Sequence, residues 1–187
     1  RTVVGYTTRN SGGVPDNFKN WFIVRFDRKI RDFQIYDGTK PVEGEQLVGE
    51  HALVRVGFET RRGEQVTVRA ASSFISQMQA VQNLGELGKD DFETVKAKAQ
   101  KRWDEVLGRI EVAGGTVGQY RTFYSCLYRS TLFPRKFYEI DKSGNPVHYS
   151  PYNGEVLPGY MYTDTGFWDT FRSLFPLLNL VYPSVNA

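Results

Sequence analysis

The stretch DDFETVKAKAQKRWDEVLGRI, residues 90–110, marks the point where the pattern of the chain changes. Apolar side chains recur there at every third or fourth position, which predicts an amphipathic helix. These side chains are Phe92, Val95, Ala99, Trp103, Val106 and Ile110. Asp90 and Glu93 are a candidate capping pair at its beginning. We therefore expect a helix over about residues 90–112, ended by the glycine pair that follows.

Upstream of this segment the apolar pattern has a period of two, which is typical of β-strands. NWFIVRF, residues 20–26, places its side chains alternately on two faces. Similar runs follow in KIRDFQIY, HALVRVGF and QVTVRAASSFI, and Asp37-Gly38 is a strong turn signal between them. Short strands with glycine-rich turns and no intervening helix predict an antiparallel β-sandwich up to about residue 76.

Downstream, Thr116 and Gln119 form the capping box of a second predicted helix, over about residues 117–133. Pro134 ends it, and its aromatic residues on several sides suggest burial between neighbours.

Residues 135–163 contain three prolines and three glycines, which predicts a long irregular loop of a kind that is often functional. A third helix is expected over about residues 166–181, bent or interrupted at Pro176.

Composition limits the possible classes of function. The chain has 187 residues, 40% of them hydrophobic and 24% charged, as in an ordinary globular protein. A net charge of +3 gives no indication of a nucleic-acid partner, and no apolar run is long enough for a membrane span. The single cysteine, Cys126, excludes a disulfide framework and is expected to be a buried, inert thiol. The two histidines are not in a metal-binding motif.

The motif FWDTFR, residues 167–172, offers two interpretations. In the structural one, Asp169 caps the third helix or pairs with Arg172 three residues later, which would stabilise the helix by a few tenths of a kcal/mol. In the functional one, the Trp168 ring packs on a pyranose while Asp169 accepts hydrogen bonds from neighbouring hydroxyls. The residues alone leave both interpretations open.

Two longer segments carry a family resemblance. FYSCLYRSTLFPRKF, residues 123–137, followed by YTDTGFWDTFRSLFPLLNLVYP, residues 162–183, is similar to the corresponding segments of the glycoside hydrolase family 92 α-mannosidases. SSFISQMQAVQNL, residues 72–84, resembles the last sandwich strand of that family and its exit toward the linker helices. The Arg102-Trp103 pair resembles a linker-helix motif.

The resemblance implies an α+β, two-domain fragment: an antiparallel β-sandwich part followed by helices that belong to an (α/α)6 barrel. Residues 1–78 would be part of the N-terminal sandwich and residues 79–115 the linker helix region. Residues 116–187 would begin an incomplete catalytic barrel.

The resemblance also implies an activity: exo-acting, Ca²⁺-dependent, inverting hydrolysis of α-mannose, at α-1,2 or related linkages, from mannose-containing glycans. Such enzymes are secreted or periplasmic bacterial proteins, and inversion needs an acid and a base carboxyl group. We expect both groups, and the calcium ligands, to lie beyond Ala187, so that this chain alone is inactive. Trp168 and Asp169 would line the site for the terminal mannose, with Tyr162 and Asp164 as weaker candidates. The alternatives are a non-catalytic carbohydrate-binding β-sandwich module and an (α/α)6 glycosidase of another family.

Overall fold

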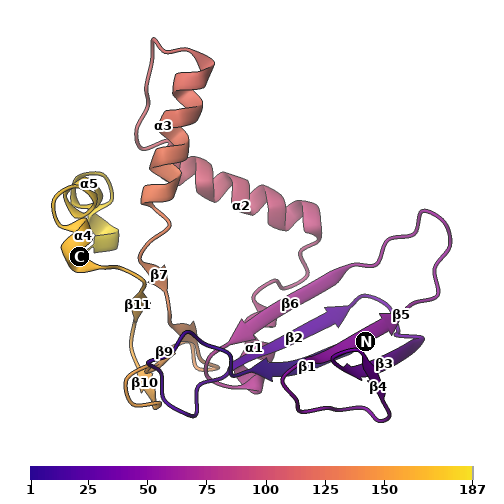
Figure 1. Cartoon of the computed structure of the whole chain (residues 1–187). Coiled ribbons are helices and arrows are strands. Elements are labelled where there is room, and N and C mark those ends of the chain that lie inside the picture. The colour runs from indigo at the N-terminus through magenta and orange to yellow at the C-terminus, as the bar shows by residue number, and fades with distance from the viewer. Residues whose placement is uncertain (187) are drawn as a thin grey trace. The chain divides into compact units, whose positions relative to one another are not determined.

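The computed structural model describes residues 1–186, and these fall into two compact units, one over Arg1–Gly85 and one from Glu86 onward (Figure 1). Antiparallel sheets dominate the first unit, and most of the helices are in the second. The predicted α+β class is therefore confirmed. The domain boundaries predicted after residues 78 and 115 stay predictions.

The first unit contains two three-stranded antiparallel sheets, with strand orders β1-β2-β6 and β4-β3-β5. The first sheet comprises β1 (Thr2–Thr7), β2 (Asn20–Phe26) and β6 (Val68–Ser73). The second comprises β3 (Asp32–Asp37), β4 (Lys40–Val42) and β5 (Ala52–Gly57). The four strands named from the sequence are confirmed as β2, β3, β5 and β6, whereas β4 was not predicted. Gly38, at φ 58°, makes the predicted turn between β3 and β4.

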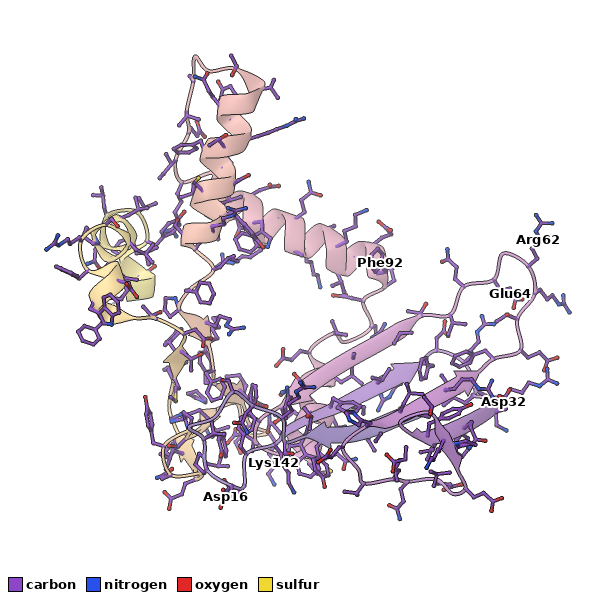
Figure 2. The ribbon with its side chains drawn as sticks, viewed as in Figure 1. Asp16, Asp32, Arg62, Glu64, Phe92 and Lys142 are labelled. Carbon is purple, nitrogen blue, oxygen red and sulfur yellow. The ribbon has the colours of Figure 1, made fainter. Side chains whose placement is uncertain are left out.

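A ring contact and an ion pair join residues that lie at strand ends or in the loops of this unit. Phe26, at the end of β2, packs against Phe58 with ring centroids 4.9 Å apart. Arg28 donates to Glu64 at 3.1 Å and to the Gln65 carbonyl at 3.0 Å. Figure 2 shows Glu64 beside Arg62 in the loop between β5 and β6.

Helix α1 (Gln77–Gly85) was not among the predicted helices, and β6 ends at Ser73 rather than near residue 76. The Ser73 hydroxyl accepts hydrogen bonds from the backbone N–H groups of Ile75 and Ser76, which turns the chain out of the sheet. α1 then packs against β2 and β6. Ile23 of β2 is 2% exposed and Ala80 of α1 is 0% exposed, so the core of this unit lies between helix and sheet.

In the second unit, α2 (Phe92–Leu107) is shorter than predicted, and its cap is Asp91. The Asp91 carboxylate accepts the Thr94 N–H at 2.8 Å, whereas Asp90 pairs with Lys98. The predicted pair of Asp90 with Glu93 is therefore wrong. Phe92 is 70% exposed at the beginning of the helix (Figure 2), and no side chain of α2 is fully buried.

Helix α3 (Val117–Ser130) begins with the predicted capping box of Thr116 and Gln119. Its predicted burial between neighbours is only partial, because Leu127 is its one buried residue in the described chain. The Tyr128 ring packs against Trp103 of α2 at 4.6 Å. Cys126 is exposed, so the prediction of a buried thiol is wrong: its neighbour Leu127, one position further round the helix, takes the inner face.

The predicted irregular loop over residues 135–163 instead contains five short strands. They are β7 (Arg135–Lys136), β8 (Glu139–Ile140), β9 (Pro146–Tyr149), β10 (Val156–Pro158) and β11 (Tyr162–Thr163). The prolines and glycines lie in the turns and at strand ends. Asp141 accepts the backbone N–H groups of Ser143 and Asn145, which closes the turn between β8 and β9.

The predicted third helix is interrupted before Pro176 rather than at it. α4 (Phe167–Thr170) and α5 (Leu174–Val181) are separated by a turn, and α6 (Pro183–Asn186) follows. A proline ring clashes with the carbonyl four residues earlier, here that of Arg172. The helix therefore stops before that clash and starts again with Pro176 in its first turn.

Candidate functional site

The four residues predicted to contact substrate lie in one segment, residues 162–169, which includes β11 and the beginning of α4. β11 pairs antiparallel with β7, Tyr162 opposite Lys136 and Thr163 opposite Arg135. The Phe137 N–H donates to the Met161 carbonyl at 2.8 Å and extends this ladder. The segment is therefore attached at its beginning to the chain that follows α3.

Asp164 is bound within the protein. Its carboxylate accepts a hydrogen bond from Arg135 Nε at 2.6 Å and one from the Thr163 hydroxyl at 3.0 Å. The hydrogen bond from Arg135 is the main reason that the pKa of the Asp164 carboxyl lies below its ordinary value. Its backbone is left-handed, with φ 68°, a conformation that Asp and Asn tolerate better than most residues. Asp164 thus anchors the bend between β11 and α4.

We predict a small, pH-dependent loss of stability in Asp164→Asn. Asparagine also tolerates the left-handed backbone, so this variant removes the charge and little else. Both side chains of the ion pair are largely exposed, so the loss at pH 7 is about 0.2–1 kcal/mol. Because the folded pKa is lowered, the stabilisation is complete above the unfolded value of about 3.9 and disappears as pH falls through the folded value. Melting curves of both proteins at pH 7 and at pH 2 check this. An equal difference at both pH values would contradict the charge-based account.

Asp169 has a free carboxylate in the described part of the chain. Its backbone N–H donates to the Gly166 carbonyl at 3.1 Å, but no described residue forms a hydrogen bond or ion pair with its side chain. Arg172, the predicted structural partner, lies over the Phe171 ring instead, 5.2 Å from its centroid. Gly166, not Asp169, is the N-cap residue of α4, and it contributes no side-chain cap.

The two residues that precede Asp169 in the sequence are large aromatic residues whose side chains are exposed to solvent. Trp168 is 68% exposed and Phe167 is 75% exposed. An exposed indole beside an unpaired carboxylate can pack on the apolar face of a sugar ring while the carboxylate binds hydroxyl groups.

Tyr162 belongs to a cluster of three tyrosine rings. The Tyr138 ring meets those of Tyr160 and Tyr162 edge-on, at 4.8 and 5.9 Å. Burial, with smaller effects of Tyr138, raises the pKa of the Tyr162 phenol, so it remains a neutral hydrogen-bonding group near neutral pH. Arg135 and Tyr138 were not predicted to be near this segment, because only the pairing of β7 with β11 brings them there.

The described residues bring together no cluster of acidic side chains of the kind that binds calcium. Within residues 1–186, no three His, Cys, Asp or Glu side chains come close enough together to hold a metal ion. His148 is used otherwise, since its Nδ1 lies 2.9 Å from the Gly159 carbonyl oxygen. Calcium binding needs six to eight oxygen ligands, so no chemical step is assigned to a metal held by this chain.

Two family models match the sequence. Residues 1–73 match the glycosyl hydrolase family 92 N-terminal domain, and residues 79–187 match the glycosyl hydrolase family 92 catalytic domain. No helix among the described residues is long and apolar enough to span a membrane.

Solved structures match almost the whole chain. An inverting mannosidase of family GH92 from Bacteroides thetaiotaomicron is 48% identical, with a TM-score of 0.94, over 99% of this chain and 25% of its own. A GH92 α-mannosidase from the same organism, in complex with mannoimidazole, is 27% identical, with a TM-score of 0.80 and the same coverage. An uncharacterized secreted glycosidase from Arthroderma benhamiae is 38% identical over 77 residues, 38% of this chain and 10% of its own. The chain therefore spans about a quarter of the length of these solved relatives.

Proposed function

Because the chain belongs to glycosyl hydrolase family 92, we propose that it is part of an exo-acting, inverting α-mannosidase that removes mannose from glycans. The observation that supports this most strongly is the 48% identity to an inverting mannosidase over 99% of the chain. In this proposal residues 79–187 contribute the beginning of the catalytic domain. The acid and base carboxyl groups that inversion requires come from the rest of a longer polypeptide.

Trp168 and Asp169 hold the terminal mannose in this proposal. The exposed indole packs on the apolar face of the ring, and the unpaired carboxylate accepts hydrogen bonds from hydroxyl groups. Tyr162 remains a candidate at the edge of the site. Asp164 has the weaker claim, because Arg135 and Thr163 already occupy its carboxylate.

The two alternative interpretations are both less well supported. The interpretation as an (α/α)6 glycosidase of another family is wrong, since the matched models are those of family 92. A non-catalytic carbohydrate-binding module is disfavoured, because more than half of the chain matches a catalytic domain.

Three finer features belong to the same proposal. Calcium supports catalysis from ligands supplied outside this chain. The preferred linkage is α-1,2 or a related one. The protein is secreted or periplasmic and bacterial, which is supported by a relative named as secreted and by solved relatives from Bacteroides.

The activity of the full-length protein tests the proposal. We expect it to hydrolyse an aryl α-mannoside with inversion, to lose this activity on chelation and to recover it with Ca²⁺. The isolated 187-residue chain should be inactive under the same conditions, and Ca²⁺ should leave its melting temperature unchanged, because its described residues group no metal ligands. Retention of configuration in the product, seen by NMR, would contradict the mechanism. Turnover by the isolated chain would show that the catalytic residues lie within it.

A further inference from the structure

Gly166 stands at the junction between the Asp164 bend and α4, and its backbone does not require glycine. Its φ is −77° and its ψ is 105°, an extended conformation that any residue adopts. It is the N-cap residue of α4, a position that Ser, Thr, Asp, Asn and Gly all occupy readily, and it makes no side-chain hydrogen bond to the helix. The backbone therefore does not require glycine at this position, and capping accepts glycine without selecting it over Ser, Thr, Asp or Asn.

The space around Gly166 does account for it. A Cβ atom at this residue would lie 2.9 Å from Asp169 Oδ2, closer than real Cβ atoms approach other atoms. The next nearest atoms, Cγ and Cβ of the same aspartate, would be 3.8 and 3.9 Å away, which is ordinary contact. Among the described residues beyond its two chain neighbours, the one atom that a Cβ at residue 166 would approach too closely is the carboxylate oxygen of Asp169.

We propose that Gly166 is a positioning residue that sets the orientation of the Asp169 carboxylate toward the sugar. This inference rests on the proposed function, in which that carboxylate binds mannose. Without a side chain at residue 166, the carboxylate folds back over the beginning of α4. The substrate can then meet the carboxylate in an orientation that a side chain at residue 166 would exclude.

The backbone of this turn is fixed while the carboxylate is not. The Gly166 carbonyl accepts the Asp169 N–H at 3.1 Å and the Thr170 hydroxyl at 3.0 Å. No described residue holds the Asp169 side chain by a hydrogen bond. A methyl group at residue 166 would therefore be accommodated by rotation of the aspartate side chain rather than by movement of the helix.

Gly166→Ala consequently separates activity from stability. Alanine restricts the unfolded chain and fits the native φ, but it is a poorer N-cap residue than glycine, so the two effects offset and the melting temperature should change little. The carboxylate, however, is moved by a distance on the order of 1 Å, and a misplacement of that size can cost about 100-fold in rate. We expect kcat/KM to fall roughly 10- to 100-fold.

The experiment uses the full-length mannosidase and four variants: Gly166→Ala, Asp169→Ala, the double variant, and Gly85→Ala as a control. Gly85 also lacks a left-handed φ, and a Cβ there would meet nothing within 4 Å. For each protein we would measure kcat/KM on an aryl α-mannoside, the Kd of mannoimidazole and the melting temperature. Gly166→Ala should weaken both substrate turnover and mannoimidazole binding. In the Asp169→Ala background it should have no further effect, because the group that it displaces is gone.

The results separate the positioning role of Gly166 from the mannose-binding role of Asp169. If Asp169→Ala is impaired but Gly166→Ala behaves like wild type, the positioning role is wrong and the proposed function stands. Equal losses from Gly166→Ala in both backgrounds would also overturn it, since glycine would then act independently of Asp169. If Asp169→Ala turns over and binds mannoimidazole like wild type, the proposed role of Asp169 fails and the inference fails with it.

Discussion

Asp169→Asn in the full-length enzyme should lower kcat/KM by an amount on the order of 2–4 kcal/mol while the melting temperature changes little. The physical reason is that a carboxylate makes charge-assisted hydrogen bonds to sugar hydroxyls, and these are lost or weakened with a neutral amide. Stability should be nearly unaffected because no described residue pairs with this carboxylate and it caps no helix. Steady-state kinetics on an aryl α-mannoside and a thermal melt measure both quantities.

Asp104→Asn is the matched control for that experiment, since it makes the same chemical change at an exposed position of α2. Its kinetics and stability should match those of wild type. An Asp169→Asn protein that melts early but turns over normally would contradict the binding role and restore the structural interpretation, in which loss of a cap costs about 1 kcal/mol of stability.

Ile23→Ala should destabilise the 187-residue chain by about 2–5 kcal/mol. Ile23 is the most buried large side chain of β2, the central strand between β1 and β6, and α1 packs against the same sheet. Truncation of the side chain removes apolar contacts and leaves a cavity. Because β2 is hydrogen-bonded to β1 on one side and to β6 on the other, it cannot move to fill this cavity. Urea denaturation monitored by tryptophan fluorescence measures the change in the free energy of unfolding.

Val48→Ala serves as the comparison, because Val48 is 83% exposed and its truncation should change the free energy of unfolding by less than about 0.5 kcal/mol. Similar losses in the two variants would show that the core of the first unit does not lie between α1 and the sheet.

Local patterns predicted the elements whose determinants are local. The strand around Ile23 follows from the alternation of its own side chains, and the beginning of α3 follows from the capping box of Thr116 and Gln119. Both predictions are confirmed. The prediction that Asp90 caps the helix with Glu93 was wrong: the neighbouring Asp91, which is equally suitable chemically, is the cap, and Asp90 pairs with Lys98 instead.

Features that depend on contacts between distant parts of the chain could not be predicted from local sequence patterns. The five strands within residues 135–163 are two to four residues long, too short for a period-two pattern to stand out among prolines and glycines. The pairing of Arg135 with Asp164 spans 29 positions and depends on the register of β7 and β11. Exposure of Cys126 likewise depends on which face of α3 has neighbours. The substrate assignment of Trp168 and Asp169 came from the family resemblance, since the residues alone fitted a helix cap equally well.

A crystal structure of the full-length protein with mannoimidazole is the most direct test that this chain supplies part of a mannose site. We expect an Asp169 carboxylate oxygen about 2.5–3.0 Å from a hydroxyl oxygen of the ligand. We also expect the Trp168 ring to pack against the apolar face of the ligand. A ligand bound with neither residue in contact would contradict the assignment of Trp168 and Asp169 to the mannose site.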